Sequence, residues 1–239
     1  MNSNHIIYKS NSRGHANLGW LDTYHTFSFS NYYNPERVQF GALRVLNDDT
    51  IEGGTGFDLH PHENMEIITI PLKGALEHKD SMGNVGVINR GDIQVMSAGT
   101  GIYHSEYNFN KKDKGKFLQI WILPDKQNVT PRYGQITLNE ADSLNRLQQI
   151  VSPNPNDEGL WIHQQAWLYI GNFDQSTELI YNLRNNGNGV FFFIIKGTVR
   201  INGETLETRD SIGIIDADTI SITASSDSEV LVIEVPMNK

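Results

Sequence analysis

Residues 54–66 read Gly-Thr-Gly-Phe-Asp-Leu-His-Pro-His-Glu-Asn-Met-Glu and lead into an apolar run at residues 66–72. Side chains two positions apart in a β-strand lie on the same face, with Cα atoms roughly 6–7 Å apart. His60 and His62 can therefore reach one metal ion. Taken alone the pair is equally compatible with polar surface, because Pro61 interrupts the hydrogen bonding of a strand.

A second pair with the same spacing lies downstream. His104 and Glu106 follow a glycine-rich turn in residues 99–108, which read Gly-Thr-Gly-Ile-Tyr-His-Ser-Glu-Tyr-Asn. On neighbouring strands of a small barrel, the two pairs would form a site of three histidines and one carboxylate. Neutral imidazole suits Zn, Cu, Fe and Ni, and a carboxylate adds one hard anionic ligand. The spacing leaves a rival carboxylate open, because Glu66 has the same strand parity as His62.

The composition indicates a globular protein and excludes several classes. The chain has 239 residues, of which 38% are hydrophobic and 20% charged, enough for one large or two small domains. A formal net charge of −9 argues against a nucleic-acid partner. There is no cysteine, so the site has no thiolate ligand. No stretch has the apolar length of a signal peptide or a membrane helix, and we expect a cytoplasmic monomer without membrane contact.

Short strands separated by glycine turns predict an all-β fold, a sandwich or closed antiparallel barrel. Residues 66–72, 117–123 and 190–195 are expected to be apolar strands. One helix is expected at residues 139–150, where Asn139 is a suitable N-cap and three apolar residues follow at three-residue spacing. These residues are Leu144, Leu147 and Ile150.

The chain repeats itself after a Pro- and Asn-rich segment at residues 152–159. In both halves an apolar strand ends at Lys-Gly, at residues 73–74 and 196–197, and an Arg-containing turn precedes the next strand. Such self-similarity suggests a duplicated domain, and we divide the chain into residues 1–135 and 136–239. The second copy lacks the histidine pairs. His163 is the only histidine after residue 104, and we interpret it, like His15 and His25, as structural.

Several segments carry a family resemblance. The spacing of Gly54, the histidine pair and Glu66, together with His104 and Asn108, resembles the two motifs of the cupin superfamily. Residues 19–29, 40–49, 76–84 and 98–106 resemble the pirin family, including its bacterial quercetinase-like members. These segments read Gly-Trp-Leu-Asp-Thr-Tyr-His-Thr-Phe-Ser-Phe, Phe-Gly-Ala-Leu-Arg-Val-Leu-Asn-Asp-Asp, Leu-Glu-His-Lys-Asp-Ser-Met-Gly-Asn and Ala-Gly-Thr-Gly-Ile-Tyr-His-Ser-Glu.

The resemblance implies a bicupin with two antiparallel jelly-roll barrels. The helix expected at residues 139–150 would link the two barrels. The N-terminal domain would bind one divalent transition metal ion, and the C-terminal domain would be metal-free. The implied ligands are His60, His62, His104 and Glu106. Glu66 stays as an alternative ligand or as a partner of one. Fe(II) is the expected ion, and Zn, Cu, Ni, Mn and Co are alternatives.

The resemblance also implies quercetin 2,3-dioxygenase activity, in which O2 cleaves the central ring of a flavonol and releases carbon monoxide. Glu106 would act as general base, and Phe27, Phe29, Phe57 and Met65 are candidates for the wall of the substrate cavity. A non-enzymatic metal or redox sensor that binds a protein partner is the alternative. A sugar isomerase is less favoured, because few basic residues flank the two motifs.

Overall fold

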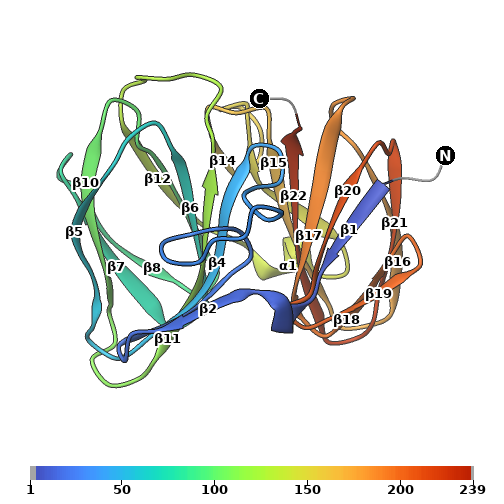
Figure 1. Cartoon of the computed structure of the whole chain (residues 1–239), viewed down its shortest axis with the longest axis horizontal. Coiled ribbons are helices and arrows are strands. Elements are labelled where there is room, and N and C mark those ends of the chain that lie inside the picture. The colour runs from blue at the N-terminus through green and yellow to red at the C-terminus, as the bar shows by residue number, and fades with distance from the viewer. Residues whose placement is uncertain (1–3, 238–239) are drawn as a thin grey trace.

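The computed structural model describes residues 4–237 and consists of two β-sandwich domains side by side (Figure 1). Each domain pairs a seven-stranded sheet with a four-stranded sheet. The prediction of an all-β, two-domain fold is confirmed. The prediction of closed barrels is not confirmed, because among the described residues no hydrogen-bonded ladder joins the two sheets of a domain and each sheet keeps two edge strands.

The first domain contains most of the N-terminal half of the chain. Its seven-stranded sheet has the spatial order β12 (Arg132–Thr137), β9 (Asp92–Ser97), β6 (Glu66–Lys73), β11 (Gly115–Ile122), β4 (Leu43–Ile51), β3 (Leu21–His25) and β2 (Gly14–Asn17). Its four-stranded sheet has the order β5 (Gly56–His62), β10 (Ile102–Asn108), β7 (Ala75–Asp80) and β8 (Val85–Asn89). All pairings in these two sheets are antiparallel.

The second domain repeats this arrangement. Its larger sheet has the order β1 (Asn4–Tyr8), β20 (Ser211–Ile215), β17 (Asn188–Lys196), β22 (Ser228–Pro236), β15 (Trp167–Phe173), β13 (Leu147–Ser152) and β14 (Leu160–Trp161). Its smaller sheet has the order β16 (Thr177–Asn182), β21 (Thr219–Ala224), β18 (Thr198–Ile201) and β19 (Glu204–Glu207). A single 3-10 turn, η1 (Ser10–Ser12), follows β1.

The duplication predicted from the sequence is confirmed strand by strand. Strands β5 to β11 and β16 to β22 occupy matching positions in the two sheet orders. The Lys-Gly turns at the ends of β6 and β17 also match, because Gly74 and Gly197 both adopt positive φ, +77° and +81°, which glycine tolerates without a steric penalty. Strand β1 pairs with β20 as β12 pairs with β9, so Figure 1 shows the blue N-terminal strand among the red ones. The domain boundary at residues 135 and 136 stays a prediction.

Apolar residues between the two large sheets hold the domains together. One buried cluster combines Ile68 and Leu118 from the first domain with Phe191 and Leu231 from the second. Phe27 joins this cluster, with its ring 5.5 Å from that of Phe191. Burial of this kind contributes roughly 25 cal/mol per Å² of apolar surface, so the contact between the domains is part of the folded core.

The predicted helix at residues 139–150 is wrong beyond its first turn. Helix α1 (Glu140–Ser143) begins after Asn139, whose side chain accepts a hydrogen bond from the Ala141 amide at 3.3 Å. The helix ends at Leu144, whose backbone is extended with φ −72° and ψ 117°, and Asn145 follows with a φ of +55°. The following residues form β13, which pairs with β15. A spacing of three residues does not separate a helix from a strand, and the partner strand β15 is distant in sequence.

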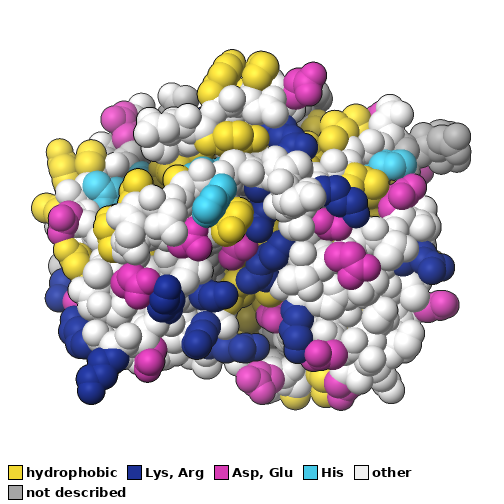
Figure 2. Space-filling model, turned by 60° about the horizontal axis from the view of Figure 1, so that its bottom comes forward, with side chains coloured by type: hydrophobic (Ala, Val, Ile, Leu, Met, Phe, Trp, Pro, Cys, Tyr) yellow, Lys and Arg dark blue, Asp and Glu magenta, His cyan; other side chains and the backbone are white. Residues whose placement is uncertain are grey.

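Charged side chains are unevenly distributed over the surface. Figure 2 shows Lys and Arg side chains gathered toward the middle and lower left of one face, with Asp and Glu among them. Hydrophobic side chains and histidines lie above them in this view. Within residues 4–237, no helix has the length and apolar character that crossing a membrane requires.

Candidate metal centre

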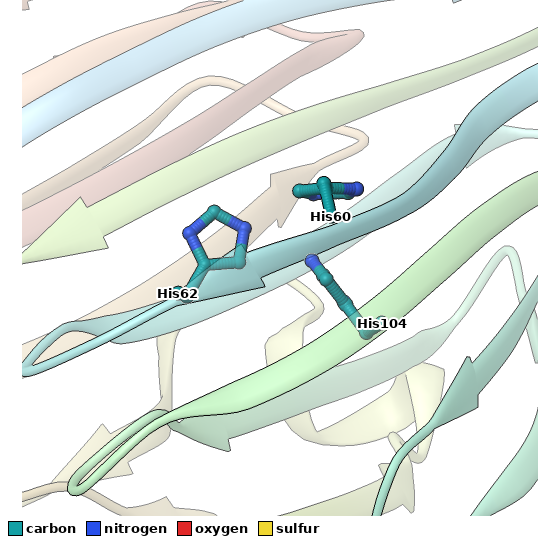
Figure 3. A group of neighbouring side chains, drawn as sticks. All are labelled: His60, His62 and His104. Atoms are coloured by element: carbon teal, nitrogen blue, oxygen red, sulfur yellow. The ribbon is translucent and has the colours of Figure 1, made fainter.

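Three histidines from two adjacent strands converge inside the first domain. His60 and His104 are direct cross-strand partners in β5 and β10, and His62 follows two residues after His60. The ligand nitrogens of the three rings all lie within 4.8 Å of one another. Ring centroids are 4.4 Å apart for His60 and His104 and 4.8 Å apart for His62 and His104. Figure 3 shows the rings pointing toward one another. The predicted convergence of these three histidines is therefore present in the structure.

A β-bulge sets the orientation of His60. His104 pairs with His60 but Glu106 pairs with Phe57, so β5 contains one residue more than β10 between these pairs. Within the bulge, the Asp58 carbonyl accepts a hydrogen bond from His60 Nδ1 at 2.7 Å. A backbone partner on one ring nitrogen fixes the tautomer and leaves the other nitrogen for a metal ion.

The electrostatics of the histidines suit a transition metal. Both ring nitrogens of His104 are buried and have no hydrogen-bond partner among the described residues, although buried polar atoms are nearly always bonded. Burial, with the neighbouring His60 and His62, lowers the pKa of His104 to about 2. Burial, with His60, lowers the pKa of His62 to about 4. Uncharged imidazoles with free lone pairs are metal ligands, so the residues present fit such an ion.

Glu106 lies next to His104, two residues further along β10. Its carboxylate is buried and accepts hydrogen bonds from Gln119 Nε2 at 2.9 Å and from Thr69 Oγ1 at 3.4 Å. Its oxygen belongs to a second group of ligand atoms within 4.8 Å of one another, together with His78 and His104. Burial raises the pKa of Glu106, and nearby histidines oppose the shift. His104 therefore belongs to both groups and links Glu106 to His60 and His62.

Glu66 lies outside the site. Its carboxylate accepts a hydrogen bond from Ser97 Oγ at 2.7 Å, and the Arg132 guanidinium is close enough to favour its ionised form. Glu66 alternates with Thr69, whose hydroxyl reaches Glu106, and so lies on the other face of β6. Alternation along one strand would have placed Glu66 on the same face as His62. It does not apply here, because Asn64, between strands β5 and β6, has a φ of +47° and interrupts the extended backbone.

His78 is a member of the site that the sequence reasoning missed. It lies on β7 directly opposite Glu106 on β10. The ring is buried, its Nε2 is 3.2 Å from Asp80 Oδ2, and its Nδ1 has no partner among the described residues. The signal was present in the sequence, because His78 and Asp80 have the same two-residue spacing as the other pairs.

A cavity of about 580 Å³ opens over the histidines. Five aromatic side chains line its wall: Trp20, Phe29, Tyr32, Phe57 and Trp121. Of the four residues proposed for this wall, Phe29 and Phe57 line it. Phe27 packs instead in the core between the domains, and Met65 packs against Ile67 and Met96. Strand β3 ends at His25, so strand alternation does not place Phe27 and Phe29 on one face.

A row of polar side chains crosses the large sheet at the floor of the cavity. His25, Asn47 and Gln119 are successive cross-strand neighbours on β3, β4 and β11 and line the cavity. Thr69 on β6 is the next neighbour in the row. His25 Nδ1 lies 2.9 Å from Asn47 Oδ1. His15 lies at the cavity wall, with its Nε2 2.6 Å from Asp22. His163 packs against Trp161, with ring centroids 4.8 Å apart, and is not part of the cavity wall.

Comparisons with known proteins agree with this geometry. Residues 7–122 match the family model described as Pirin, and residues 149–235 match the model described as Quercetinase C-terminal cupin domain. The chain is 46% identical to the quercetin 2,3-dioxygenase of Escherichia coli K12 over 97% of this chain and 99% of that protein. It is 38% identical to a pirin-like protein of Caulobacter vibrioides, over 92% and 95% of the two chains.

Solved structures show the same fold. The crystal structure of YhhW from Escherichia coli has a TM-score of 0.93 and 44% identity, covering 98% of this chain and 99% of that one. A structure described as the bacterial pirin YhhW in complex with nickel(II) has a TM-score of 0.92 and 44% identity, covering 97% and 99%. Two copies of one sandwich, with a histidine cluster in the first, define a two-domain cupin. The chain belongs to the pirin family.

Proposed function

We propose that this protein is a metal-dependent dioxygenase that cleaves a flavonol or a related enol with O2. The observation that carries the proposal is the group of three converging histidines at the base of an aromatic cavity of about 580 Å³, a size within the range of small-molecule sites. The name of the 46% identical relative, quercetin 2,3-dioxygenase, supports the same chemistry.

His60, His62, His104 and Glu106 would hold the metal ion. Glu106 shares a ligand group with His104, which supports its inclusion. We propose Fe(II), because imidazole and carboxylate together suit it; Zn, Cu, Ni, Mn and Co are alternatives, and nickel is bound in the structure of a relative. When bound, such an ion supplies Lewis-acid stabilisation of negative charge on a substrate oxygen.

The protein's own residues orient the substrate and accept its proton. Phe29 and Trp121 contact each other edge to face, with centroids 5.3 Å apart, and leave an apolar wall for a flat ring. The wall also keeps water from the reacting atoms. Glu106 is held by Gln119 and Thr69, which supports its proposed role as the base that accepts the proton of the flavonol 3-hydroxyl group.

The test is carbon monoxide release and O2 consumption with quercetin, on protein reconstituted anaerobically with Fe(II). The His60→Ala variant is the control. Turnover in the wild type that vanishes in the control supports the dioxygenase. Full metal loading without turnover contradicts it and favours the sensor that acts through a protein partner.

A further inference from the structure

Four polar side chains form a compact group on the floor of the cavity, on the sheet that faces the metal-binding strands. Thr23 pairs with Asp49, and His25 pairs with Asn47, across β3 and β4. All four are buried, and all four line the cavity. None belongs to the two groups of ligand atoms that the described residues form. They constitute a polar surface separate from the candidate metal centre.

Asp49 is the member of this group with an open hydrogen-bonding position. His25 and Asn47 bond each other at 2.9 Å. Asp49 is only 3% exposed, and its Oδ1 has no hydrogen-bond partner among the described residues. A buried carboxyl oxygen without a partner is costly in the free protein, and a ligand that bonds it removes the cost.

The charge around Asp49 restricts the kind of ligand. Burial raises the pKa of Asp49 to about 7, while the Thr23 hydroxyl opposes the shift and Asp48 and Glu106 add to it. Near neutral pH this carboxyl therefore both donates and accepts hydrogen bonds. Two nearby carboxylates disfavour an anionic ligand group. A hydroxyl group has a donor and acceptor lone pairs, and so matches both forms of the carboxyl.

We propose that Asp49 binds a hydroxyl group of the substrate at the floor of the cavity, away from the oxygen that meets the metal centre. The consequence is selectivity for polyhydroxylated aromatic enols over those with a single hydroxyl group. The inference rests on the proposed function for the nature of the occupant, since the aromatic walls and the metal centre accept the rest of the flavonol.

The experiment measures binding without turnover. Metal-loaded wild type and Asp49→Asn are titrated anaerobically with quercetin and with 3-hydroxyflavone, which lacks every hydroxyl group except the 3-hydroxyl. Quenching of tryptophan fluorescence reports binding, because Trp20 and Trp121 line the cavity. The isosteric amide keeps the packing, and metal content and the thermal unfolding midpoint verify the variant.

We expect quercetin to bind Asp49→Ala, titrated in the same way, about tenfold more weakly through the loss of one hydrogen bond, and 3-hydroxyflavone to bind wild type and variant equally. Asp49→Asn should lose less, because its amide keeps a donor and an acceptor. Equal losses for the two ligands, or no loss for quercetin, in Asp49→Ala overturn the inference. So does a wild type that binds neither ligand. Carbon monoxide release by the wild type is measured separately. A failed Asp49 test therefore leaves the dioxygenase proposal standing, and an absence of carbon monoxide release leaves the binding result for Asp49 standing.

Discussion

The two domains share one strand arrangement, but their interiors differ at equivalent positions. In the first domain His60 faces His104 across β5 and β10. Counted from the matching Lys-Gly turns, the equivalent pair across β16 and β21 in the second domain is Tyr181 and Ile220. The position of Glu106 is occupied by Ile222 and that of His78 by Ile201, and these two are again cross-strand partners.

The interiors follow from these exchanges. The second sandwich contains one continuous apolar cluster that includes Phe192, Ile222 and Val232. In the first, two small apolar clusters leave room between them for the cavity and its polar floor. The same backbone arrangement therefore accommodates either a cavity with a histidine cluster or a continuous apolar core. The side chains at a few inward-facing positions decide which of the two forms.

The largest expected effect comes from removing a histidine of the cluster. His104→Ala and His60→Ala should lower metal affinity by well over about 100-fold, because even loss of a residue that only supports a ligand costs about 10–100-fold. Elemental analysis after dialysis measures the bound metal, and circular dichroism checks the fold. His163→Ala is the matched control in the second half of the chain and should bind metal like the wild type. Full metal content in His104→Ala would contradict the ligand assignment.

A pair of phenylalanine substitutions measures the difference between a core and a site. Phe192 is fully buried in the second domain, and Phe192→Ala should lower the free energy of unfolding by about 3–5 kcal/mol. Phe57 is partly exposed at the cavity wall, and Phe57→Ala should cost about 1 kcal/mol. Chemical denaturation followed by circular dichroism gives both values. Equal losses would show that the first domain depends on its cavity wall as strongly as the second depends on its core.

Much of the difference between the two domains could be predicted from the sequence, because it depends on patterns within short segments. Alternation in short segments identified the strands, and the two-residue spacing placed His60 with His62. The repeated Lys-Gly turns revealed the duplication, whose glycines both adopt positive φ. The absence of histidine beyond residue 163 separated the two interiors.

What could not be predicted depends on non-local register. Strand β13 was mistaken for a helix because its partner β15 is not adjacent to it in sequence. The place of Glu66 depended on the positive φ of Asn64, which no alternation rule supplies. His78 and the polar floor require knowing which strands are neighbours, since Asp49 meets the cavity only because β4 lies in the facing sheet.

Glu66 offers a smaller test, at the face of β6 that turns toward the second domain. Burial raises its pKa to about 7 from 4.5, while Ser97 and Arg132 oppose the shift. The folded protein therefore holds this proton up to about pH 7, and the unfolded chain releases it near pH 4.5. Stability linked to the group is fully present below pH 4.5 and is lost as the pH rises through 7, by up to about 3 kcal/mol.

Glu66→Gln should remove that dependence, because the amide accepts the Ser97 hydrogen bond without carrying a charge. In metal-free protein, wild type and variant should be similarly stable at pH 4.5, and the variant should gain on the wild type up to about pH 8. Denaturation curves across this range measure the difference, in which other titrating groups cancel. If the free energies of unfolding of wild type and variant changed with pH in parallel, Arg132 would compensate the buried charge of Glu66 fully. Glu66 would then have the same pKa in the folded and unfolded chain, and this prediction would be wrong.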